Sequence, residues 1–301
     1  MNAQQLAADF GIRGVVDFAE EGGLVKAVVS QGGMQGELFL QGATVTRWHP
    51  AGAQPVIFTS PNAIFAPGTA VRGGVPIIFP WFGPKQDEPK APQHGFVRAA
   101  PWQLESVDES RPDEVRLRLS ITQGEATSPF WPEAYRAVYT VAFGPALTVE
   151  LAVQNRAGHE IGFEEALHTY FAISDIGKVS VTGFSGTTYI DKVDGFQRKT
   201  QDSSPIKLSG ETDRVYLSTP RQAVIEDPEW RRRIVVEKDG AASSIVWNPW
   251  NEKAAAMKDL GAEAWRGMIC VETGNAADNA VRLAAGGEHR MTTRISVDVI
   301  G

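Results

Sequence analysis

Short segments rich in Val, Leu, Phe and Thr recur along almost the whole chain, and glycine or proline separates many of them. In residues 102–110 (WQLESVDES) and 114–121 (EVRLRLSI), apolar and polar side chains alternate. This alternation is typical of half-buried β-strands, and the SRPDE sequence between them predicts a turn. The same texture continues through 135–155 and up to 289–301. The sequence therefore predicts an all-β fold, a sandwich of large twisted antiparallel sheets.

Signals for helices are few. Residues 1–11 (MNAQQLAADFG) predict a short N-terminal helix. Residues 251–260 (NEKAAAMKDL) predict one or two turns, with Gly261 at the C-cap position, and 128–133 (SPFWPE) predict another such piece. We find no internal repeat and no linker in the 301 residues. We therefore expect one domain over 1–301, although this length also allows two average domains.

Bulk charge and cysteine content exclude several classes of protein. The formal net charge is −7 and the isoelectric point is near 5.4, without a basic stripe, which argues against nucleic-acid and anionic-membrane partners. The single cysteine, Cys270, excludes an intramolecular disulfide and a cysteine-based zinc site, and its apolar surroundings predict inert core. The chain shows no secretory signal and no apolar run long enough to cross a bilayer. We expect a soluble, cytoplasmic monomer.

The stretch 71–98, VRGGVPIIFPWFGPKQDEPKAPQHGFVR, has an apolar centre and polar ends. Arg72 precedes two glycines, and Gln93, His94 and Arg98 lie at the other end. Glycine permits close approach of the backbone to a ligand, and loops with specific polar residues tend to carry function. The alternative is a Pro/Gly-rich crossover whose arginines are simply solvated.

One histidine and one carboxylate stand out as candidates for chemistry. His49, His159 and His289 lie in turn-like sequence, where a surface position is expected. His168 lies among strand-like apolar and aromatic residues, either as a hydrogen-bonded core histidine or as a functional group. Glu272 follows an apolar run and precedes Thr-Gly-Asn, which predicts the end of a buried strand. Its pKa can be raised there so that it acts as a base, unless it is simply exposed to water.

Familiar cofactor motifs do not occur in this chain. No HxH, HExxH or other cluster at ligand spacing indicates a metal, and no GxGxxG before a helix or GxxxxGK[ST] indicates a nucleotide. The GxSxG nucleophile motif is also missing. No cofactor and no metal are therefore expected. A histidine and a carboxylate alone can perform proton transfer.

Six sequence motifs occur in order along the chain. They are VRGGVPIIFPWFGP, PQHGFVR, ALHTYF, ETDRVY, VWNPW and CVETGNAADNAV. Together they resemble the hexose-6-phosphate mutarotases, the glucose-6-phosphate 1-epimerases of the aldose 1-epimerase superfamily, over about 24–299. The resemblance implies a galactose-mutarotase-like β-supersandwich. It also implies that the α and β anomers of a hexose 6-phosphate are interconverted.

The resemblance further implies roles for individual residues. His168 matches the histidine that protonates the sugar ring oxygen, and Glu272 matches the glutamate that takes the proton of the anomeric hydroxyl. The positions that match ligand contacts are Arg72, Gln93, His94, Arg98 and Asp213. We expect His168 and Glu272 to face one cleft and to bracket a space the size of a pyranose. His168 should be protonated when Glu272 is ionised.

Two other interpretations remain open. A mutarotase of unphosphorylated aldoses would keep the His/Glu pair. It would have less need of two arginines at one site, because the guanidinium fork of arginine suits a phosphate group. A non-catalytic carbohydrate-binding sandwich would keep aromatic residues without needing both proton-transfer groups. The aromatic candidates for stacking on a sugar, or for simple core packing, are Trp81, Phe82, Trp247 and Trp250. The segment 85–91 (KQDEPKA) could alter the rim of the pocket.

Overall fold

The computed structural model describes residues 1–86, 88–124 and 129–300. Its strands form two eight-stranded sheets, one four-stranded sheet and one two-stranded sheet, and the paired strands run antiparallel. The all-β prediction is confirmed. The organisation as one domain over 1–301 stays a prediction.

One eight-stranded sheet, here called the long sheet, forms a continuous layer with the order β13-β17-β18-β22-β9-β8-β7-β6. Its strands are β13 (Ser180–Thr182), β17 (Gln222–Asp227), β18 (Arg232–Asp239), β22 (Glu288–Val299), β9 (Leu147–Asn155), β8 (Tyr135–Phe143), β7 (Glu114–Thr122) and β6 (Gln103–Arg111). Buried and more exposed positions alternate along β7 and β18. One face of these strands therefore packs on the core and the other meets solvent, as the alternating sequence predicts.

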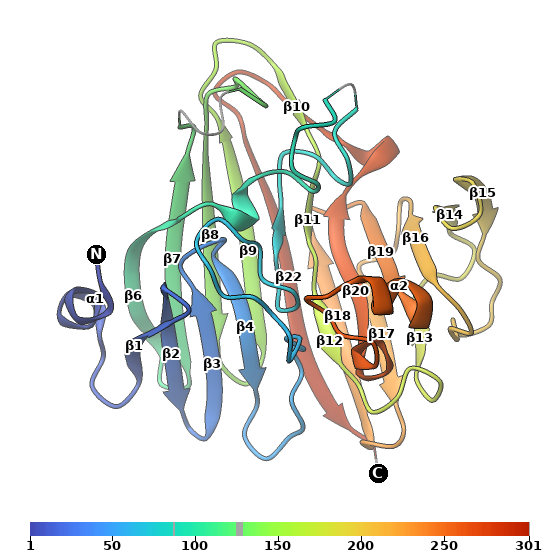
Figure 1. The fold of residues 1–301 in the computed structure, drawn as a ribbon, viewed down its shortest axis with the longest axis horizontal. Helices are drawn as coiled ribbons and strands as arrows, with labels where there is room; N and C mark the ends of the chain where they lie inside the picture. The colour runs from blue at the N-terminus through green and yellow to red at the C-terminus, as the bar shows by residue number, and fades with distance from the viewer. Residues whose placement is uncertain (87, 125–128, 301) are drawn as a thin grey trace.

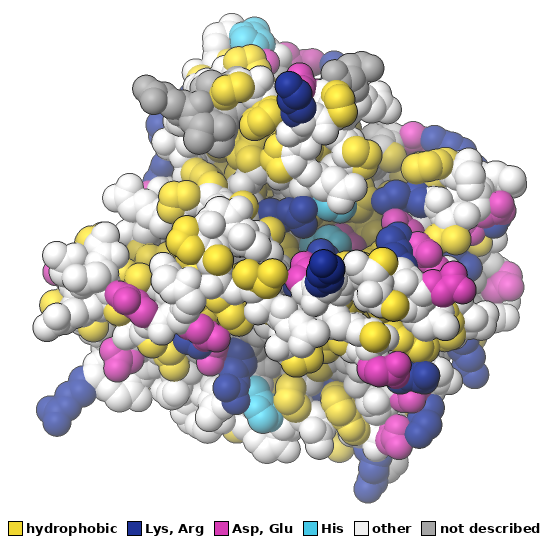
Figure 2. All heavy atoms as spheres, viewed as in Figure 1, with side chains coloured by type: hydrophobic (Ala, Val, Ile, Leu, Met, Phe, Trp, Pro, Cys, Tyr) yellow, Lys and Arg dark blue, Asp and Glu magenta, His cyan; other side chains and the backbone are white. Residues whose placement is uncertain are grey.

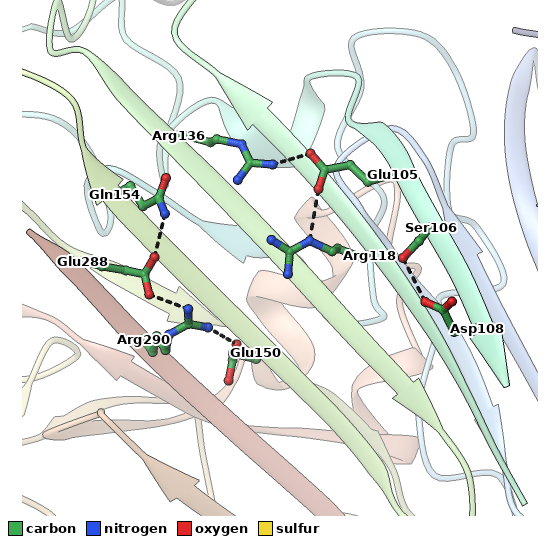
Figure 3. A network of polar contacts seen from close by, with 9 residues as sticks. All are labelled: Glu105, Ser106, Asp108, Arg118, Arg136, Glu150, Gln154, Glu288 and Arg290. Atoms are coloured by element: carbon green, nitrogen blue, oxygen red, sulfur yellow. Dashed lines mark hydrogen bonds and ion pairs between the residues drawn. The ribbon is translucent and has the colours of Figure 1, made fainter. Parts of the chain in front are cut away.

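The solvent face of the long sheet carries ion pairs between neighbouring strands, which Figure 3 shows. Arg118 on β7 donates from Nε to Glu105 on β6 at 3.1 Å, and Arg290 on β22 lies between Glu150 and Glu288. Exposed pairs of this kind contribute little to stability because solvent screens them. Opposite charges across adjacent strands do favour one register and keep this face hydrated.

The opposing layer consists of two sheets that lie side by side against the long sheet (Figure 1). The four-stranded sheet contains β1 (Val16–Glu21), β2 (Leu24–Gln31), β3 (Met34–Phe39) and β4 (Thr44–His49). It packs closely on the β8 region: a Cβ added at Gly36 would lie 2.6 Å from the Phe143 ring. Trp48, fully buried, donates from Nε1 to the Gly144 carbonyl oxygen at 3.2 Å.

The second eight-stranded sheet, here called the site sheet, has the order β15-β14-β16-β19-β20-β11-β5, with β12 also paired to β20. Its strands are β15 (Gln197–Thr200), β14 (Thr188–Asp191), β16 (Thr212–Tyr216), β19 (Ser243–Asn248), β20 (Met268–Asn275), β11 (Glu165–Leu167), β5 (Ile77–Ile78) and β12 (Tyr170–Ala172). Val246 and Val271 share one apolar core with Ile234 and Ile295 of the long sheet. The other face of the site sheet is therefore left for a pocket.

The remaining elements are short. They are α1 (Ala3–Phe10), α2 (Trp250–Ala256), the 3₁₀ turns η1 (Val97–Ala99), η2 (Ala264–Gly267) and η3 (Ala277–Asn279), and the two-stranded sheet of β10 (Ile161–Phe163) and β21 (Val281–Leu283). The predicted N-terminal helix is confirmed, and Asn2 caps it in a capping box with Gln5. In the described part of the chain, no helix has both the length and the apolar character needed to cross a membrane.

Three local predictions need correction. The helix predicted over 251–260 ends at Ala256, and Gly261, with φ of +88°, follows a separate turn instead of capping the helix. Residues 129–133 form a turn and irregular chain without a helix, while Ser128 lies outside the described residues. Residues 56–60 (VIFTS) have the same strand-like composition as the predicted strands, but they make only isolated bridges, Ile57 with Phe171 and Thr59 with Gly73.

Candidate active site

A pocket of about 490 Å³ opens on the site sheet. Figure 2 shows a hollow near the centre of this face, where histidine and basic side chains gather. The residues singled out in the sequence all line the pocket: Arg72, Gln93, His94, Arg98, His168, Asp213 and Glu272. Segments far apart in the chain therefore meet at one place, which has the size of a small-molecule site.

Glu272 lies inside a fully buried strand. All eight residues of β20 are buried, and the exposed fraction of the Glu272 side chain is 1%. The prediction of a strand end at this position is wrong, because β20 continues through Thr-Gly-Asn to Asn275. Gly274 does not end the strand but permits close packing: a Cβ there would lie 2.7 Å from the Glu165 carbonyl oxygen on β11. Glu272 is thus a carboxyl group held rigidly at the pocket floor.

His168 lies in the two-residue gap between β11 and β12. Its backbone N–H donates to the Pro76 carbonyl oxygen at 3.0 Å, and its ring stacks on Tyr170 with centroids 4.8 Å apart. Its Nδ1 is 3.3 Å from Oε1 of Glu272, which is within ion-pair range but outside hydrogen-bond geometry. His168 Nδ1 and Glu272 Oε2 are therefore buried without a hydrogen-bond partner. Because such groups are costly, this favours a functional pair over a satisfied core histidine.

Burial acts on the two groups in opposite directions. It raises the pKa of Glu272 well above its usual range, and the nearby negative charge of Asp213 adds to the rise. It lowers the pKa of His168 well below its usual range, and the positive charges of Arg98 and Arg72 add to the fall. Burial therefore favours the protonated form of Glu272 and the neutral form of His168, the reverse of the charge states expected from the sequence. Either arrangement holds one proton between the pair.

The raised pKa of Glu272 makes a prediction about stability. The folded state binds a proton there that the unfolded state has already lost, so this group's contribution to stability falls as pH rises above the unfolded value of about 4.5. The Glu272→Gln variant removes this penalty. We expect its melting temperature to exceed that of the wild type by more at about pH 8 than at about pH 5. Thermal unfolding at both pH values checks this, and an equal difference at both would contradict it.

His94 is held in a strained backbone conformation beside the pair. Its φ is +63°, its N–H donates to the Gly83 carbonyl oxygen at 2.7 Å, and its Nδ1 accepts from the Gly83 N–H at 3.2 Å. Burial, together with the charges of Arg98 and Lys192, lowers the pKa of His94 to about 3. The ring is therefore neutral and carries its proton on Nε2, so it offers one hydrogen-bond donor.

Arg72 is committed to partners within the protein. Its Nε donates to Asp259 Oδ2 at 3.0 Å and its Nη1 donates to the Tyr170 hydroxyl at 3.1 Å. The following Gly73, with φ of +105°, lies so close to residues 58–60 that a Cβ would meet the backbone at 2.6 Å. Arg72 thus braces its loop and fixes Tyr170, on which His168 stacks.

Arg98 has no comparable partner. Its Nη2 donates to the backbone oxygen of Gln93 at 2.8 Å, and within the described residues no carboxylate forms an ion pair with it. Lys192, by contrast, pairs with Asp213 at 3.0 Å. The guanidinium of Arg98 is therefore the pocket cation best placed to meet an anionic ligand.

Comparison with known proteins identifies the family of this chain. The family model described as aldose 1-epimerase matches residues 26–296. The chain belongs to the aldose 1-epimerase family. It is 36% identical over 251 residues to a protein of Escherichia coli strain K12 and 34% identical over 262 residues to one of Cenchrus ciliaris, both provisionally named glucose-6-phosphate 1-epimerase. The alignment with the Escherichia coli protein covers 83% of this chain and 83% of that protein. The alignment with the Cenchrus ciliaris protein covers 84% of this chain and 78% of that protein.

Solved structures agree with this assignment. A crystal structure from Salmonella typhimurium, provisionally titled a mutarotase, superposes with a TM-score of 0.90 at 30% identity and covers 96% of each chain. A galactose mutarotase-like protein of Clostridium acetobutylicum, at 11% identity and a TM-score of 0.74, supports the fold alone. The predicted galactose-mutarotase-like fold and the predicted epimerase class are confirmed. The roles of individual residues in this aldose 1-epimerase family member stay predictions.

The aromatic candidates divide into two groups. Phe82 and Trp247 line the pocket. Trp81 is buried in the core, and Trp250 packs on Trp265 with ring centroids 4.4 Å apart. Only the first two can therefore contact a ligand in this pocket.

Sequence reasoning missed a group of lining residues on the turn between β14 and β15. Lys192, Val193 and Phe196 all line the pocket, and Val193 and Phe196 have exposed fractions of 49% and 66%. The run DKVDGFQ between two strand-like segments would have indicated a hairpin turn, but not its position at the rim. The segment 85–91 was expected to alter the rim of the pocket. None of its described residues lines the pocket, and Asp87 lies outside the described residues.

The histidines expected at the surface behave differently from one another. His159 is exposed and His49 is half-buried. His289 is also half-buried, and its Nε2 lies 2.8 Å from Oε1 of Glu165, which is fully buried. The surface expectation for His289 is wrong because β22 carries it under the site sheet, beside Asn275.

The His289–Glu165 pair predicts a pH-dependent stability. Burial alone would lower the pKa of His289, but the hydrogen bond and charge of Glu165 outweigh it, and the pKa is raised. The pair's contribution is therefore fully present below the unfolded value of about 6.5 and is lost as pH rises through the folded value. We expect His289→Gln to destabilise more at about pH 6 than at about pH 9. Urea unfolding of both proteins checks this, and a pH-independent difference would refute it.

Proposed function

We propose that the protein interconverts the α and β anomers of a hexose 6-phosphate, as a glucose-6-phosphate 1-epimerase. The observation that carries the proposal is the buried pair of His168 and Glu272, with unpartnered proton-transfer atoms at the floor of a monosaccharide-sized pocket. Membership of the aldose 1-epimerase family and the names of the relatives support it.

The reaction needs two proton transfers, one at each of the two oxygens bonded to C1. One group takes the proton of the C1 hydroxyl while the other gives a proton to the ring oxygen, so that the C1–O bond of the ring breaks without leaving an alkoxide or an oxocarbenium ion. The open-chain aldehyde rotates about C1–C2. Closure on the other face reverses both transfers and restores the proton to the pair. The cycle requires that the pair hold one proton, and the 3.3 Å between His168 Nδ1 and Glu272 Oε1 is short enough for that proton to pass from Glu272 to His168 before the ring opens.

The 3.3 Å separation refines the expected geometry. A pyranose ring does not fit between His168 Nδ1 and Glu272 Oε1, so the expectation that the pair brackets a whole ring is wrong. The two oxygens that exchange protons are bonded to the same carbon. Neighbouring groups at the pocket floor therefore suit them better than groups on opposite walls, and we assign the ring-oxygen proton to His168 and the C1 hydroxyl proton to Glu272.

Ligand positioning falls to the other lining residues. We propose that Arg98 meets the phosphate, since no carboxylate among the described residues pairs with it, that Gln93 and Asp213 contact the sugar, and that Arg72 supports the pocket wall beside them. His94 can donate from Nε2 to a sugar oxygen. The other lining cations, Arg72, Lys192 and Lys253, each pair with a carboxylate, so Arg98 is the lining cation left for an anionic group of the substrate.

Anomer-exchange NMR tests the proposal directly. Catalysed exchange with glucose 6-phosphate should exceed that with glucose or galactose at equal concentration. Faster exchange with an unphosphorylated sugar would instead support a plain aldose mutarotase. Binding without any exchange would support a carbohydrate-binding sandwich. We further propose a cytoplasmic monomer without nucleic-acid or membrane partners, which size-exclusion chromatography with light scattering tests for the oligomeric state.

A further inference from the structure

A third buried side chain lies beside the proposed proton-transfer pair. Cys270 precedes Glu272 by two positions on β20, so the two side chains leave the strand on the same face. One ligand-type atom from each of His168, Cys270 and Glu272 lies within 4.8 Å of the other two. Cys270 is fully buried and takes no part in the proposed proton transfers. It also packs in an apolar cluster with Ile78, Tyr170 and Trp247, as the sequence predicts.

The three groups have the chemistry of a zinc ligand set. Imidazole nitrogen, thiolate sulfur and carboxylate oxygen all bind Zn²⁺, at about 2.0–2.3 Å, and tetrahedral geometry then places neighbouring N and O ligands about 3.3 Å apart. The separation between His168 Nδ1 and Glu272 Oε1 is already 3.3 Å. The sulfur has to approach by about 1 Å, since its N and O neighbours would lie about 3.6 Å away in such a site.

A second observation points to a ligand at this place. His168 Nδ1 and Glu272 Oε2 are buried polar atoms without hydrogen-bond partners, and the side chains that carry them have exposed fractions of only 10% and 1%. Buried polar atoms are normally satisfied, so unpartnered atoms on two side chains that approach to 3.3 Å are candidates for coordination. The thiol favours a soft or borderline cation over Mg²⁺ or Ca²⁺, which prefer oxygen ligands.

We propose that His168, Cys270 and Glu272 form a binding site for Zn²⁺ or a similar borderline divalent cation. His168 and Glu272 both line the pocket, so a fourth ligand such as water would reach the metal from that side. Cys270 binds as the thiolate and Glu272 as the carboxylate, so the thiol proton and the proton shared by the His168–Glu272 pair both pass to solvent. A single cysteine thus excludes zinc sites built from several cysteines, but it does not exclude a mixed site of this kind.

The proposed metal is an inhibitor and not a cofactor. It occupies the nitrogen and the carboxylate that would otherwise move protons at the sugar, so metal binding and anomer exchange exclude each other. The inhibition rests on the proposed function, whereas the binding of the metal does not. Zinc should therefore compete with the sugar phosphate for the same pocket.

Cobalt(II) is the probe that isolates this site. Cys270 is the only cysteine in the chain, so a thiolate-to-cobalt charge-transfer band can arise only from its sulfur. Titration of the full chain with CoCl₂ should produce this near-ultraviolet band, and ZnCl₂ should remove it. Cys270→Ser and Cys270→Ala should both lack it while keeping a cooperative thermal transition in the presence of a chelator. No band in the wild type overturns the proposal, as does a band that zinc does not remove.

Inhibition gives a second, independent readout. Cys270→Ala should keep its exchange activity but need more than about tenfold more Zn²⁺ for half-inhibition, because one ligand of three is lost. His159→Ala is the matched control, since it removes the exposed His159–Glu133 pair, and it should leave inhibition unchanged. Equal zinc sensitivity of Cys270→Ala and the wild type overturns the proposal. A wild type without exchange activity would refute the proposed function, and the cobalt band would still test the site.

Discussion

The Glu272→Gln and His168→Ala variants should each lose catalysed anomer exchange by about 10²- to 10⁴-fold, the usual contribution of one positioned proton-transfer group. Glutamine keeps the shape of the side chain in its fully buried position but cannot accept the C1 hydroxyl proton. Alanine removes the imidazole that faces Glu272 across 3.3 Å. NMR exchange rates with glucose 6-phosphate measure both losses.

Controls separate a chemical loss from a structural one. His168→Ala leaves a cavity between Tyr170 and Trp247, so His168→Gln serves as a second variant that fills more of the space. His159→Ala and Glu133→Gln, at an exposed ion pair, should exchange normally. Near-normal exchange by Glu272→Gln, with a melting temperature at or above that of the wild type, would remove Glu272 from the mechanism.

Strands with one solvent face were predictable from the sequence, whereas those of the site sheet were harder to delimit. On β7 and β18 one face meets water, so selection of polar residues on that face produces an alternating pattern. Every position of β19 and β20 is buried, and the pattern disappears. For that reason Thr-Gly-Asn resembled a strand end, although Gly274 serves the close approach of β11.

The candidate site was predictable as a set of residues but not as a geometry. The resemblance to a family placed His168 and Glu272 in one cleft, but no spacing in the sequence indicates that they lie 3.3 Å apart. The sequence also contains no indication of the ion-pair partners that distant segments supply to Arg72 and Asp213. Asp259, which binds Arg72, and Lys192, which binds Asp213, come from a turn and from an edge-strand hairpin without a distinctive motif.

These partners also change which arginine we expect to bind the phosphate of the substrate. Sequence alone treats Arg72 and Arg98 as equivalent. In the structure, Arg72 donates to Asp259 and Tyr170, which supports the alternative that it braces a loop. Arg98 keeps its guanidinium without a carboxylate partner among the described residues, at the edge of the same pocket. Arg98 should therefore make the main interaction with the negative charge of the substrate.

We expect Arg98→Ala to weaken the use of glucose 6-phosphate by one to two decades and that of glucose hardly at all. A hydrogen bond to a charged group contributes about 1.5–3 kcal/mol, which corresponds to this loss in kcat/KM or affinity. The loss should shrink as salt rises, because screening weakens the interaction in the wild type. Arg98→Lys should recover part of it, since lysine restores the charge without the fork.

Arg72→Ala provides the decisive comparison. Because Arg72 holds Tyr170, and Tyr170 stacks on His168, its loss should slow exchange of both sugars and lower the melting temperature. Arg266→Ala, which breaks an exposed pair with Glu263, should change neither. Kinetics of the three variants with both sugars then distinguish the two arginines. If Arg98→Ala lost equal activity with glucose and with glucose 6-phosphate, Arg98 would have no role in phosphate binding. That result would favour a mutarotase of unphosphorylated aldoses, in which both arginines only support the pocket wall.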